Sequence, residues 1–257
     1  MPALELVDEQ AVFVGCLNVR DLGGHVTAVG TRIPDRRLFR SDCIAETSQR
    51  RNESPLRSGL GTVIDLRSPS EVRQAPRVTR RAVLGLHAPL DNPQRGMTAE
   101  DWCDPHSVAE RYLELLLDGA DSVAEVLAVL TDPASYPIAF HCSGGKDRTG
   151  IIAALLLALL GVSDDDIMAD YALSGFGAAR LVIALQQRFR SRPDMVCRYV
   201  PALLSTRPDN IGLFLDGLRA KFGSVEDYVC EIGMETAIGY FRAALLGIER
   251  VRAGRIM

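Results

Sequence analysis

Lysine is nearly absent from this sequence: Lys146 and Lys221 are the only two lysines among 29 basic residues. No run of Lys and Arg offsets the formal net charge of −4. We therefore do not expect a basic face of the kind that binds nucleic acid, or general attraction to anionic membranes. An anionic ligand would need a local positive pocket instead.

Long apolar runs and paired cysteines are missing as well. The longest apolar run, from Ile151 to Leu160, is too short to span a bilayer and fits a buried helix. The first residues have neither the basic start nor the apolar core of a signal peptide. Six scattered cysteines show no CxxC pair and no zinc-type Cys/His spacing. We expect reduced thiols, no metal, no cofactor, no integral membrane association and a cytoplasmic location, with secretion by a specialised route left open.

The order of elements predicts an α/β fold. The first half reads as short strands, which we place at about 11–14, 37–40, 61–66, 82–86 and 138–140, with a helical turn near Leu56. Helical spacing begins at Ser107 and continues to Leu130, as one long helix or as two helices broken near Gly119. Ser163 is expected to cap the helix that follows the apolar run. Further helices are expected at about 176–190, 210–222, 224–232 and 235–246, with a hinge at 190–194.

At 257 residues the chain can form one large domain. We therefore expect a single domain over 1–257, with a central sheet flanked by helices. A helical lid or subdomain is expected within about 175–225, in the C-terminal helical part.

The segment His141-Cys142-Ser143-Gly144-Gly145-Lys146-Asp147-Arg148-Thr149-Gly150 carries the chemistry. It joins an apolar strand to an apolar helix, so it lies at a helix N-terminus. That position offers unpaired backbone N–H groups and a partial positive charge, which suit a bound phosphate. Gly144 and Gly145 permit the φ values that a tight anion-binding loop requires. We expect Ser143, Gly144, Gly145, Lys146 and Thr149 to bind the substrate.

Cys142 is the expected nucleophile, because a thiolate is stabilised by the same groups that bind an anion. Arg148 follows six positions later, and its planar fork suits two phosphate oxygens and the charge of the transition state. Thr149 can donate a hydrogen bond to the sulfur and ease its departure. The expected reaction is attack by sulfur on phosphorus, followed by hydrolysis of the thiophosphate. The loop supplies the positive charge, so no metal is needed.

Alone, the pattern Cys-x5-Arg occurs by chance in many proteins. The preceding strand, the two glycines, Thr149-Gly150 and the following helix make a coincidence improbable. The loop is also not a nucleotide-binding P-loop, because Asp147 follows Lys146 where Ser or Thr is required. A lysine here, in a chain that otherwise uses arginine, suggests an ammonium that reaches the phosphate or a second anionic group.

The sequence resembles a known family. The loop is similar to that of atypical bacterial tyrosine phosphatases of the protein tyrosine phosphatase B type, which also resemble phosphoinositide phosphatases. Other segments resemble that family in the expected order: Asn18-Val19-Arg20-Asp21-Leu22-Gly23-Gly24, Leu38-Phe39-Arg40-Ser41, Val63-Ile64-Asp65-Leu66-Arg67-Ser68, Asp170-Tyr171-Ala172-Leu173-Ser174 and Gly223-Ser224-Val225-Glu226-Asp227-Tyr228. The resemblance implies a cysteine-phosphatase-like fold, substrate binding by Lys146, Asp147 and Arg148, and a helical lid. Val19 departs from the family, which has an aromatic residue there.

Asp147 is the preferred general acid by this resemblance, and Asp91 is the alternative, since a loop that follows an upstream strand often overhangs such a site. Arg20 either lines the pocket or forms a salt bridge. Structural roles are favoured for Arg40 and Arg67, with Asp21, Asp65 and Glu71 available as partners. His141 is expected to hold the loop and tune the thiol, and Asp170 and Tyr171 to brace the core beneath it.

The leading expectation is a hydrolase acting on phosphotyrosine in proteins, with phosphoserine and phosphothreonine as further substrates. A phosphoinositide phosphatase whose Lys146 reads a second ring phosphate is the alternative within the same chemistry. A non-catalytic phosphate-binding module would not need Cys142 as a nucleophile. A sulfur transferase is disfavoured by the spacing to Arg148. Oligomeric state and physiological substrate are left open.

Overall fold

A computed structural model of the protein describes residues 16–44, 59–75, 83–188, 190, 200–202 and 204–246. The predicted strand at 11–14, the helical turn near Leu56 and most of the hinge at 190–194 lie outside the described residues. The domain limits and the lid also stay predictions.

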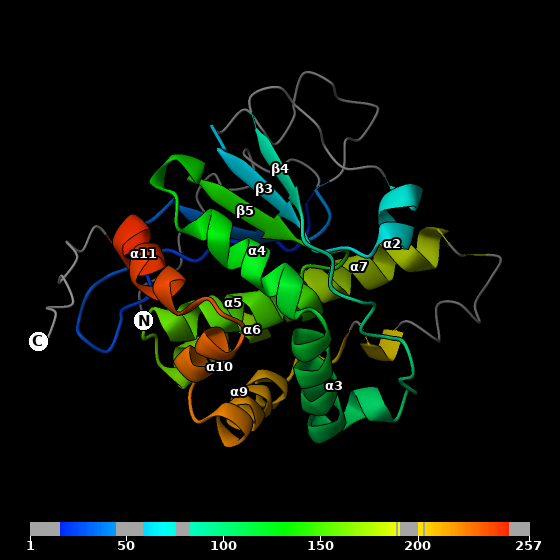
Figure 1. Ribbon diagram of the computed structural model, residues 1–257. Helices are drawn as coiled ribbons and strands as arrows, with labels where there is room; N and C mark the ends of the chain where they lie inside the picture. Colours follow the sequence, from blue (N-terminus) through cyan, green and yellow to red (C-terminus); the bar gives the residue numbers. More distant parts are fainter. Residues whose placement is uncertain are drawn as a thin grey trace, which may run out of the picture.

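A mixed sheet forms the centre of the fold (Figure 1). Its five strands lie in the order β1 (Arg20–Asp21), β2 (Leu38–Ser41), β5 (Ile138–His141), β3 (Thr62–Asp65) and β4 (Leu84–His87). β1 runs antiparallel to β2, and the other neighbours are parallel. The strands expected from 37–40 onward are confirmed, with ends shifted by one or two residues. Ser41, His141 and Asp65 lie side by side where β2, β5 and β3 end.

Side chains alternate between the two faces of the sheet. On β5, Ile138 and Phe140 belong to the main core, whereas Ala139 belongs to a smaller cluster that also contains Phe39 of β2. Parallel strands covered on both faces read as continuous apolar runs, as Ile138-Ala139-Phe140 of β5 does in the sequence. Cys142 continues the alternation of Ile138 and Phe140, and it belongs to the main core.

Helices flank this sheet, and most of the described ones lie below it in the view of Figure 1. Their bounds are α2 (Pro69–Gln74), α3 (Pro105–Asp118), α4 (Ala120–Leu130), α5 (Asp147–Leu159), α6 (Asp164–Ala172), α7 (Ser174–Arg188), α9 (Pro208–Phe222), α10 (Val225–Glu231) and α11 (Glu235–Leu246). Two short 3₁₀ helices are η2 (Asp101–Cys103) and η3 (Pro133–Ser135). The expected α/β architecture, with a central sheet flanked by helices, is confirmed.

The predicted helix ends have local causes. Ser163 caps α6, and Ser224 caps α10, each by accepting a hydrogen bond from the amide three residues later. Of the two expected arrangements after Ser107, the broken one is correct, and the break falls at Gly119. A Cβ atom on Gly119 would lie 2.2 Å from Cδ2 of Leu90, so the corner between α3 and α4 closely approaches the loop after β4.

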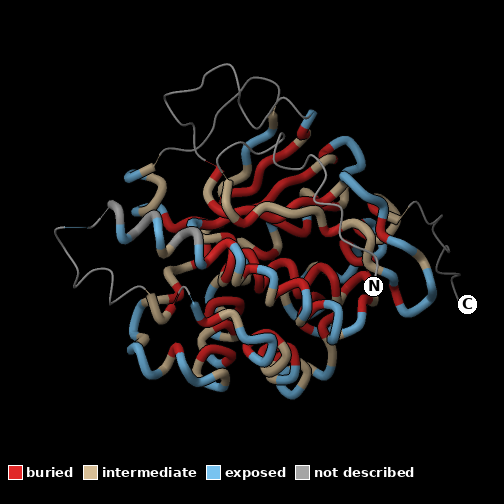
Figure 2. The backbone as a smooth tube through the Cα atoms, turned by 180° about the vertical axis from the view of Figure 1, so that it is seen from behind, coloured by how far each residue is buried: buried red, intermediate tan, exposed pale blue. Residues whose placement is uncertain are grey.

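α5 is the central helix and is buried along almost its whole length (Figure 2). α6 lies close to its first turn: a Cβ atom on Gly150 would lie 3.0 Å from the ring of Tyr171. α9 packs against α3 and α6 and buries Ile211, Phe214 and Leu218. This helix therefore belongs to the core, although all of it falls within the range of about 175–225 predicted for the lid.

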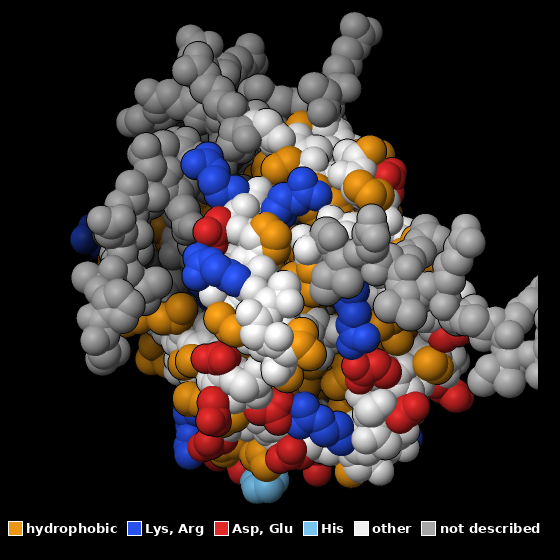
Figure 3. Space-filling view, turned by 90° about the vertical axis from the view of Figure 1, so that its left-hand side faces the viewer, with side chains coloured by type: hydrophobic (Ala, Val, Ile, Leu, Met, Phe, Trp, Pro, Cys, Tyr) orange, Lys and Arg blue, Asp and Glu red, His pale blue; other side chains and the backbone are white. Residues whose placement is uncertain are grey.

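The described surface carries charges of both signs. On the face shown in Figure 3, basic, acidic and apolar side chains are interspersed over the described part. Among the described helices, none combines the length and apolar character that crossing a membrane requires.

Candidate active site

The predicted loop lies at the carboxyl ends of β2, β5 and β3, and α5 begins at Asp147 directly after it. The site is therefore built where parallel strands end and a helix begins. Because a helix N-terminus leaves amide groups without intrahelical partners, this place favours an anion.

The carbonyl groups of the loop are bonded from outside it. Four carbonyl oxygens accept hydrogen bonds of 2.8–3.1 Å, from Leu66 N to His141, Cys43 N to Ser143, Asn18 Nδ2 to Gly144 and Arg40 Nη2 to Gly145. In a trans peptide the N–H of the next residue points opposite to the carbonyl group. The amides of Gly144, Gly145 and Lys146 therefore point into the loop, and none donates to an acceptor within the described part of the chain. Such a group of converging amides binds anions.

Gly145 is required by the shape of this loop. Its φ is +67°, which favours glycine, and a Cβ atom would lie only 2.5 Å from the backbone nitrogen of Asp42. The loop therefore lies directly against the end of β2, and a side chain at this position would force the two apart.

Arg148 forms a two-pronged ion pair with Glu71 of α2. Nη1 donates to Oε2 at 2.6 Å, and Nη2 donates to Oε1 at 2.8 Å. The Ser143 hydroxyl, also in the loop, donates to the same Oε1 at 2.6 Å. Burial raises the pKa of Glu71, but the hydrogen bonds and charge of Arg148 outweigh it and bring this pKa down to about 2. Glu71 is therefore a carboxylate that holds both the loop and its arginine.

Two buried polar groups of the loop have no partner among the described residues. They are Nε of Arg148 and the hydroxyl oxygen of Thr149. Buried polar groups are nearly always hydrogen-bonded, so unpaired ones in a loop of this shape indicate a ligand or a reacting group. With both terminal nitrogens on Glu71, the Nε edge of Arg148 remains for an anion. Cys142 is 2% exposed and lies at the start of this loop.

Burial lowers the pKa of Arg148, but the hydrogen bonds and charge of Glu71 and the electrostatic interaction with Cys142 raise it by more. The guanidinium is therefore held charged in the active-site loop. Stabilisation of a Cys142 thiolate by this charge stays a prediction.

Two further arginines, Arg40 and Arg20, form ion pairs with Asp170 next to the loop. Arg40 is fully buried, and it donates to Asp170 Oδ2 at 2.5 Å and to the Gly145 carbonyl at 2.9 Å. Arg20 donates to the other oxygen of Asp170 at 2.7 Å. Burial raises the pKa of Asp170, but the two guanidinium groups bring it well below its usual range. Asp170 thus braces the loop through Arg40.

Arg20 was expected either in the pocket or in a salt bridge. Besides Asp170, it donates to Asn18 Oδ1 at 2.8 Å and to Ser174 Oγ at 3.2 Å. Asp21, an expected partner, instead accepts hydrogen bonds from the amides of Gly23 and Arg36. Substrate binding by Arg20 stays a prediction.

Lys146, the last residue before α5, is buried with 2% exposure. Its ammonium donates to the Ser205 carbonyl at 2.9 Å and to the Ala202 carbonyl. It also lies 3.0 Å from Asp147 Oδ1 and 4.9 Å from the centre of the Trp102 ring. The side chain predicted to reach an anionic ligand therefore makes its contacts with the protein itself.

Asp147 accepts a hydrogen bond from the Tyr112 hydroxyl at 2.5 Å, again on Oδ1. Asp91, the alternative general acid, is 37% exposed and lies 3.0 Å from Arg95. The role of either carboxyl group stays a prediction.

Arg67 pairs with Asp65 at 2.7 Å, which is the structural role that the sequence favoured. His141 is buried, and its ring nitrogen Nδ1 lies 3.1 Å from the Cys142 carbonyl oxygen. Burial brings the pKa of His141 down to about 4, although Asp65 opposes this shift. A neutral imidazole therefore braces the loop.

Sequence reasoning missed three contributors: Glu71, Tyr112 and Trp102. Glu71 follows Ser68 by three residues, and this capping box at the start of α2 was a visible signal. It was considered only as a partner for other arginines. Tyr112 was assigned to the apolar face of its helix, because its spacing fits a core residue and nothing local reveals its bond to Asp147.

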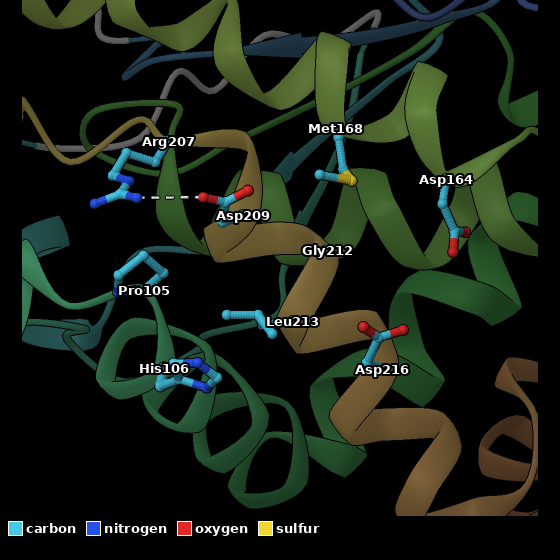
Figure 4. A pocket seen from close by; sticks show the side chains of 9 residues that line it. All are labelled: Pro105, His106, Asp164, Met168, Arg207, Asp209, Gly212, Leu213 and Asp216. Carbon is cyan, nitrogen blue, oxygen red and sulfur yellow. Dashed lines mark hydrogen bonds and ion pairs between the residues drawn. The ribbon is translucent and has the colours of Figure 1, made fainter.

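A separate groove, with a cavity volume of about 510 Å³, lies between α3, α6 and α9 (Figure 4). His106, Met168 and Asp216 line it from these three helices. No residue from 141 to 149 lines this groove, so it is distinct from the candidate active site. In the described ranges, no group of three His, Cys, Asp or Glu side chains could hold a metal ion.

Comparison with known proteins agrees with this geometry. A profile of the tyrosine phosphatase family matches residues 12–247. A protein of Cupriavidus necator named as a tyrosine-protein phosphatase is 32% identical over 221 residues, covering 82% of this chain and 80% of the relative. The chain therefore belongs to the tyrosine phosphatase family and is a phosphoric monoester hydrolase. The resemblance seen in the sequence is confirmed.

Further similar proteins include a second relative and a solved structure. The triple specificity protein phosphatase PtpB of Mycobacterium tuberculosis is 28% identical over 277 residues, covering 91% of this chain and 98% of the relative. The crystal structure of TpbA from P. aeruginosa is 18% identical, with a TM-score of 0.33, and covers 75% of this chain and 96% of that one. The family assignment rests on the sequence matches.

Proposed function

We propose that this protein hydrolyses phosphotyrosine in proteins through a phosphocysteine intermediate on Cys142, in the cytoplasm. One observation carries the proposal: a buried thiol begins a loop with three inward amides and an arginine whose Nε has no partner in the described part of the chain. The family to which the chain belongs supports phosphotyrosine as the substrate. Phosphoserine and phosphothreonine are proposed as further substrates, and the relative PtpB, named as a triple specificity protein phosphatase, supports a broad specificity.

The first step transfers the phosphoryl group to the enzyme. The inward amides of Gly144, Gly145 and Lys146, the amide of Ser143 as expected from the sequence, and the Nε edge of Arg148 bind its oxygens. The Cys142 thiolate attacks phosphorus, an S–P bond forms, and the bond to the phenolic oxygen breaks. The leaving oxygen takes a proton from Asp147, with Asp91 as the alternative.

The second step regenerates the thiolate. Water attacks phosphorus, the S–P bond breaks and inorganic phosphate leaves. The Thr149 hydroxyl, which has no partner among the described residues, donates to the sulfur as it departs. Arg148 stabilises the transition-state charge in both steps, and Glu71 holds it in place.

A trapped intermediate tests the proposal. We expect acid-quenched enzyme to carry labelled phosphate after mixing with a ³²P-phosphotyrosine peptide, and Cys142→Ser to carry none and to be inactive. Cys230→Ser, at an exposed thiol, is the matched control and should behave as wild type. A fully active Cys142→Ser enzyme would contradict the proposal. Turnover of phosphoserine, phosphothreonine and phosphoinositide substrates in the same assay defines the specificity.

A further inference from the structure

Each of the three N–H donors of the Lys146 ammonium has an acceptor. An ammonium carries three N–H donors, and three acceptors surround this one: the carbonyl oxygens of Ala202 and Ser205 and Oδ1 of Asp147. The face of the Trp102 ring covers it at 4.9 Å. A buried charge is tolerated only when it is paired in this way.

These contacts belong to a cluster of polar groups that joins the catalytic loop to the segment before α9. Asp147 Oδ1 accepts from Tyr112, whose hydroxyl lies 2.7 Å from that of Tyr171. The single hydroxyl proton of Tyr171 is directed either to Tyr112 or to the Ser205 carbonyl, 3.3 Å away, and Lys146 donates to that same carbonyl. The bond from Lys146 to Ser205 therefore does not depend on the tyrosines.

Ser205, in this segment, is also held by α9. Asn210 of α9 donates to the Ser205 carbonyl at 3.2 Å and to its hydroxyl at 3.0 Å. Ala202 is buried, whereas Leu204 beside it is half exposed. Of these contacts, the two bonds from Lys146 are the ones that reach the segment from the catalytic loop.

We propose that Lys146 is a positioning residue that fastens Ala202 and Ser205 to the catalytic loop, and that its side chain does not bind a second phosphate of the substrate. The inference rests on the proposed function and refines its substrate class. The backbone amide of Lys146 still points into the loop that binds the anion. The amide of this residue therefore binds the single phosphate, and its ammonium binds the neighbouring segment. A substrate with one phosphate can then make all the contacts that the loop provides. A second ring phosphate would make no contact with the Lys146 ammonium.

Chemical labelling tests this without turnover. The chain has two lysines, so acetylation by acetic anhydride and mass spectrometry of the digest report Lys146 and Lys221 separately. Lys221 is exposed on α9 and serves as the internal standard. We expect Lys146 in wild type to be acetylated far more slowly than Lys221. In Cys142→Ser this difference should be the same with no addition, with a phosphotyrosine peptide, or with dioctanoyl phosphatidylinositol 3,5-bisphosphate. Equal reactivity of the two lysines, or protection of Lys146 only by the bisphosphate, would overturn the inference.

A matched pair of variants gives a second test. Lys146→Met removes the charge and keeps an unbranched chain, and Lys221→Met is the control. Because buried carbonyl groups lose their donor, the amides of Ser205 and Thr206 should exchange hydrogen about 10- to 100-fold faster in Lys146→Met only. Its kcat/KM should fall by a similar factor on the phosphotyrosine peptide and on the bisphosphate, so that their ratio stays within about twofold. A loss confined to the bisphosphate, with unchanged exchange, would overturn the inference.

The two proposals fail separately. Absence of a phosphoenzyme would remove the proposed function and leave the labelling result untouched. A reactive Lys146 in an enzyme that forms the intermediate would remove only the inference. If Lys146→Met does not fold, the labelling of wild type and of Cys142→Ser still decides the question.

Discussion

Glu71 binds Arg148 end-on, through both terminal nitrogens, and so leaves Nε as the nitrogen without a partner among the described residues. An unrestrained arginine samples many rotamers, and ordering it on each substrate would cost conformational entropy. Because the Glu71 carboxylate already orders the Arg148 side chain, this entropy is not lost when substrate binds. The carboxylate also binds the Ser143 hydroxyl, so a single acidic side chain fixes two parts of the loop.

Glu71→Gln should therefore weaken catalysis more than substrate binding. A neutral amide keeps the size of the side chain but loses one charge-assisted bond, so kcat/KM should fall about 10- to 100-fold, mainly through kcat. Steady-state kinetics on a phosphotyrosine peptide measures this. Glu226→Gln removes a comparable ion pair, to Arg242 at 2.8 Å, away from the site and should leave the rate unchanged. Equal rates for both variants would show that Glu71 does not position Arg148.

His141 makes stability depend on pH in a known direction. Burial lowers its pKa to about 4, whereas an unfolded chain has a histidine pKa of about 6.5. Below pH 6.5 the unfolded state binds a proton that the folded state refuses, so stability falls as pH decreases from about 6.5 to about 4.

His141→Asn should lack this slope. Relative to the variant, wild type should lose roughly 1 kcal/mol of unfolding free energy per pH unit between pH 6 and pH 4.5. Urea denaturation of the two proteins at several pH values measures the difference, in which the other titrating groups cancel. Parallel pH profiles would mean that His141 titrates in the folded protein as it does in the unfolded chain.

Gly145→Ala should damage the site far more than an ordinary glycine substitution. Gly96 has a similar φ, +80°, but a Cβ atom there would meet nothing within 4 Å. Gly96→Ala should cost about 1 kcal/mol of stability and leave activity intact. Gly145→Ala adds the contact with Asp42, so it should cost several kcal/mol or at least 100-fold in kcat/KM. Thermal unfolding and steady-state kinetics of Gly145→Ala and Gly96→Ala separate the effect of backbone strain from that of the steric clash with Asp42. Equal losses of stability and activity in the two variants would argue against the clash.

The features that could be predicted from the sequence are those determined within a single short segment. The loop, β5 and α5 are contiguous, and the caps at Ser163 and Ser224 act over three residues, so each could be predicted from its own segment. Partners far apart in the chain could not. Glu71 and Arg148 are 77 positions apart, and with 29 basic and 33 acidic residues no local rule selects that pair. The same reason concealed the contacts of Lys146 with the segment before α9.

Asp147 and Asp91 can be separated by the leaving group. Both contacts of Asp147 described above, to Tyr112 and Lys146, involve Oδ1, so Oδ2 is the oxygen that remains to carry a proton. Phenolate from phosphotyrosine, with a pKa of about 10, needs that proton, whereas nitrophenolate leaves readily without it.

Asp147→Asn should therefore slow phosphotyrosine hydrolysis about 100-fold or more and slow p-nitrophenyl phosphate hydrolysis much less. Asp91→Asn is the comparison and should alter neither rate, because Asp91 pairs with Arg95 in the described structure. Steady-state kcat for both substrates is the measurement. If Asp91→Asn shows the leaving-group dependence and Asp147→Asn does not, the proton comes from Asp91, and Asp147 serves only to hold Lys146 and Tyr112.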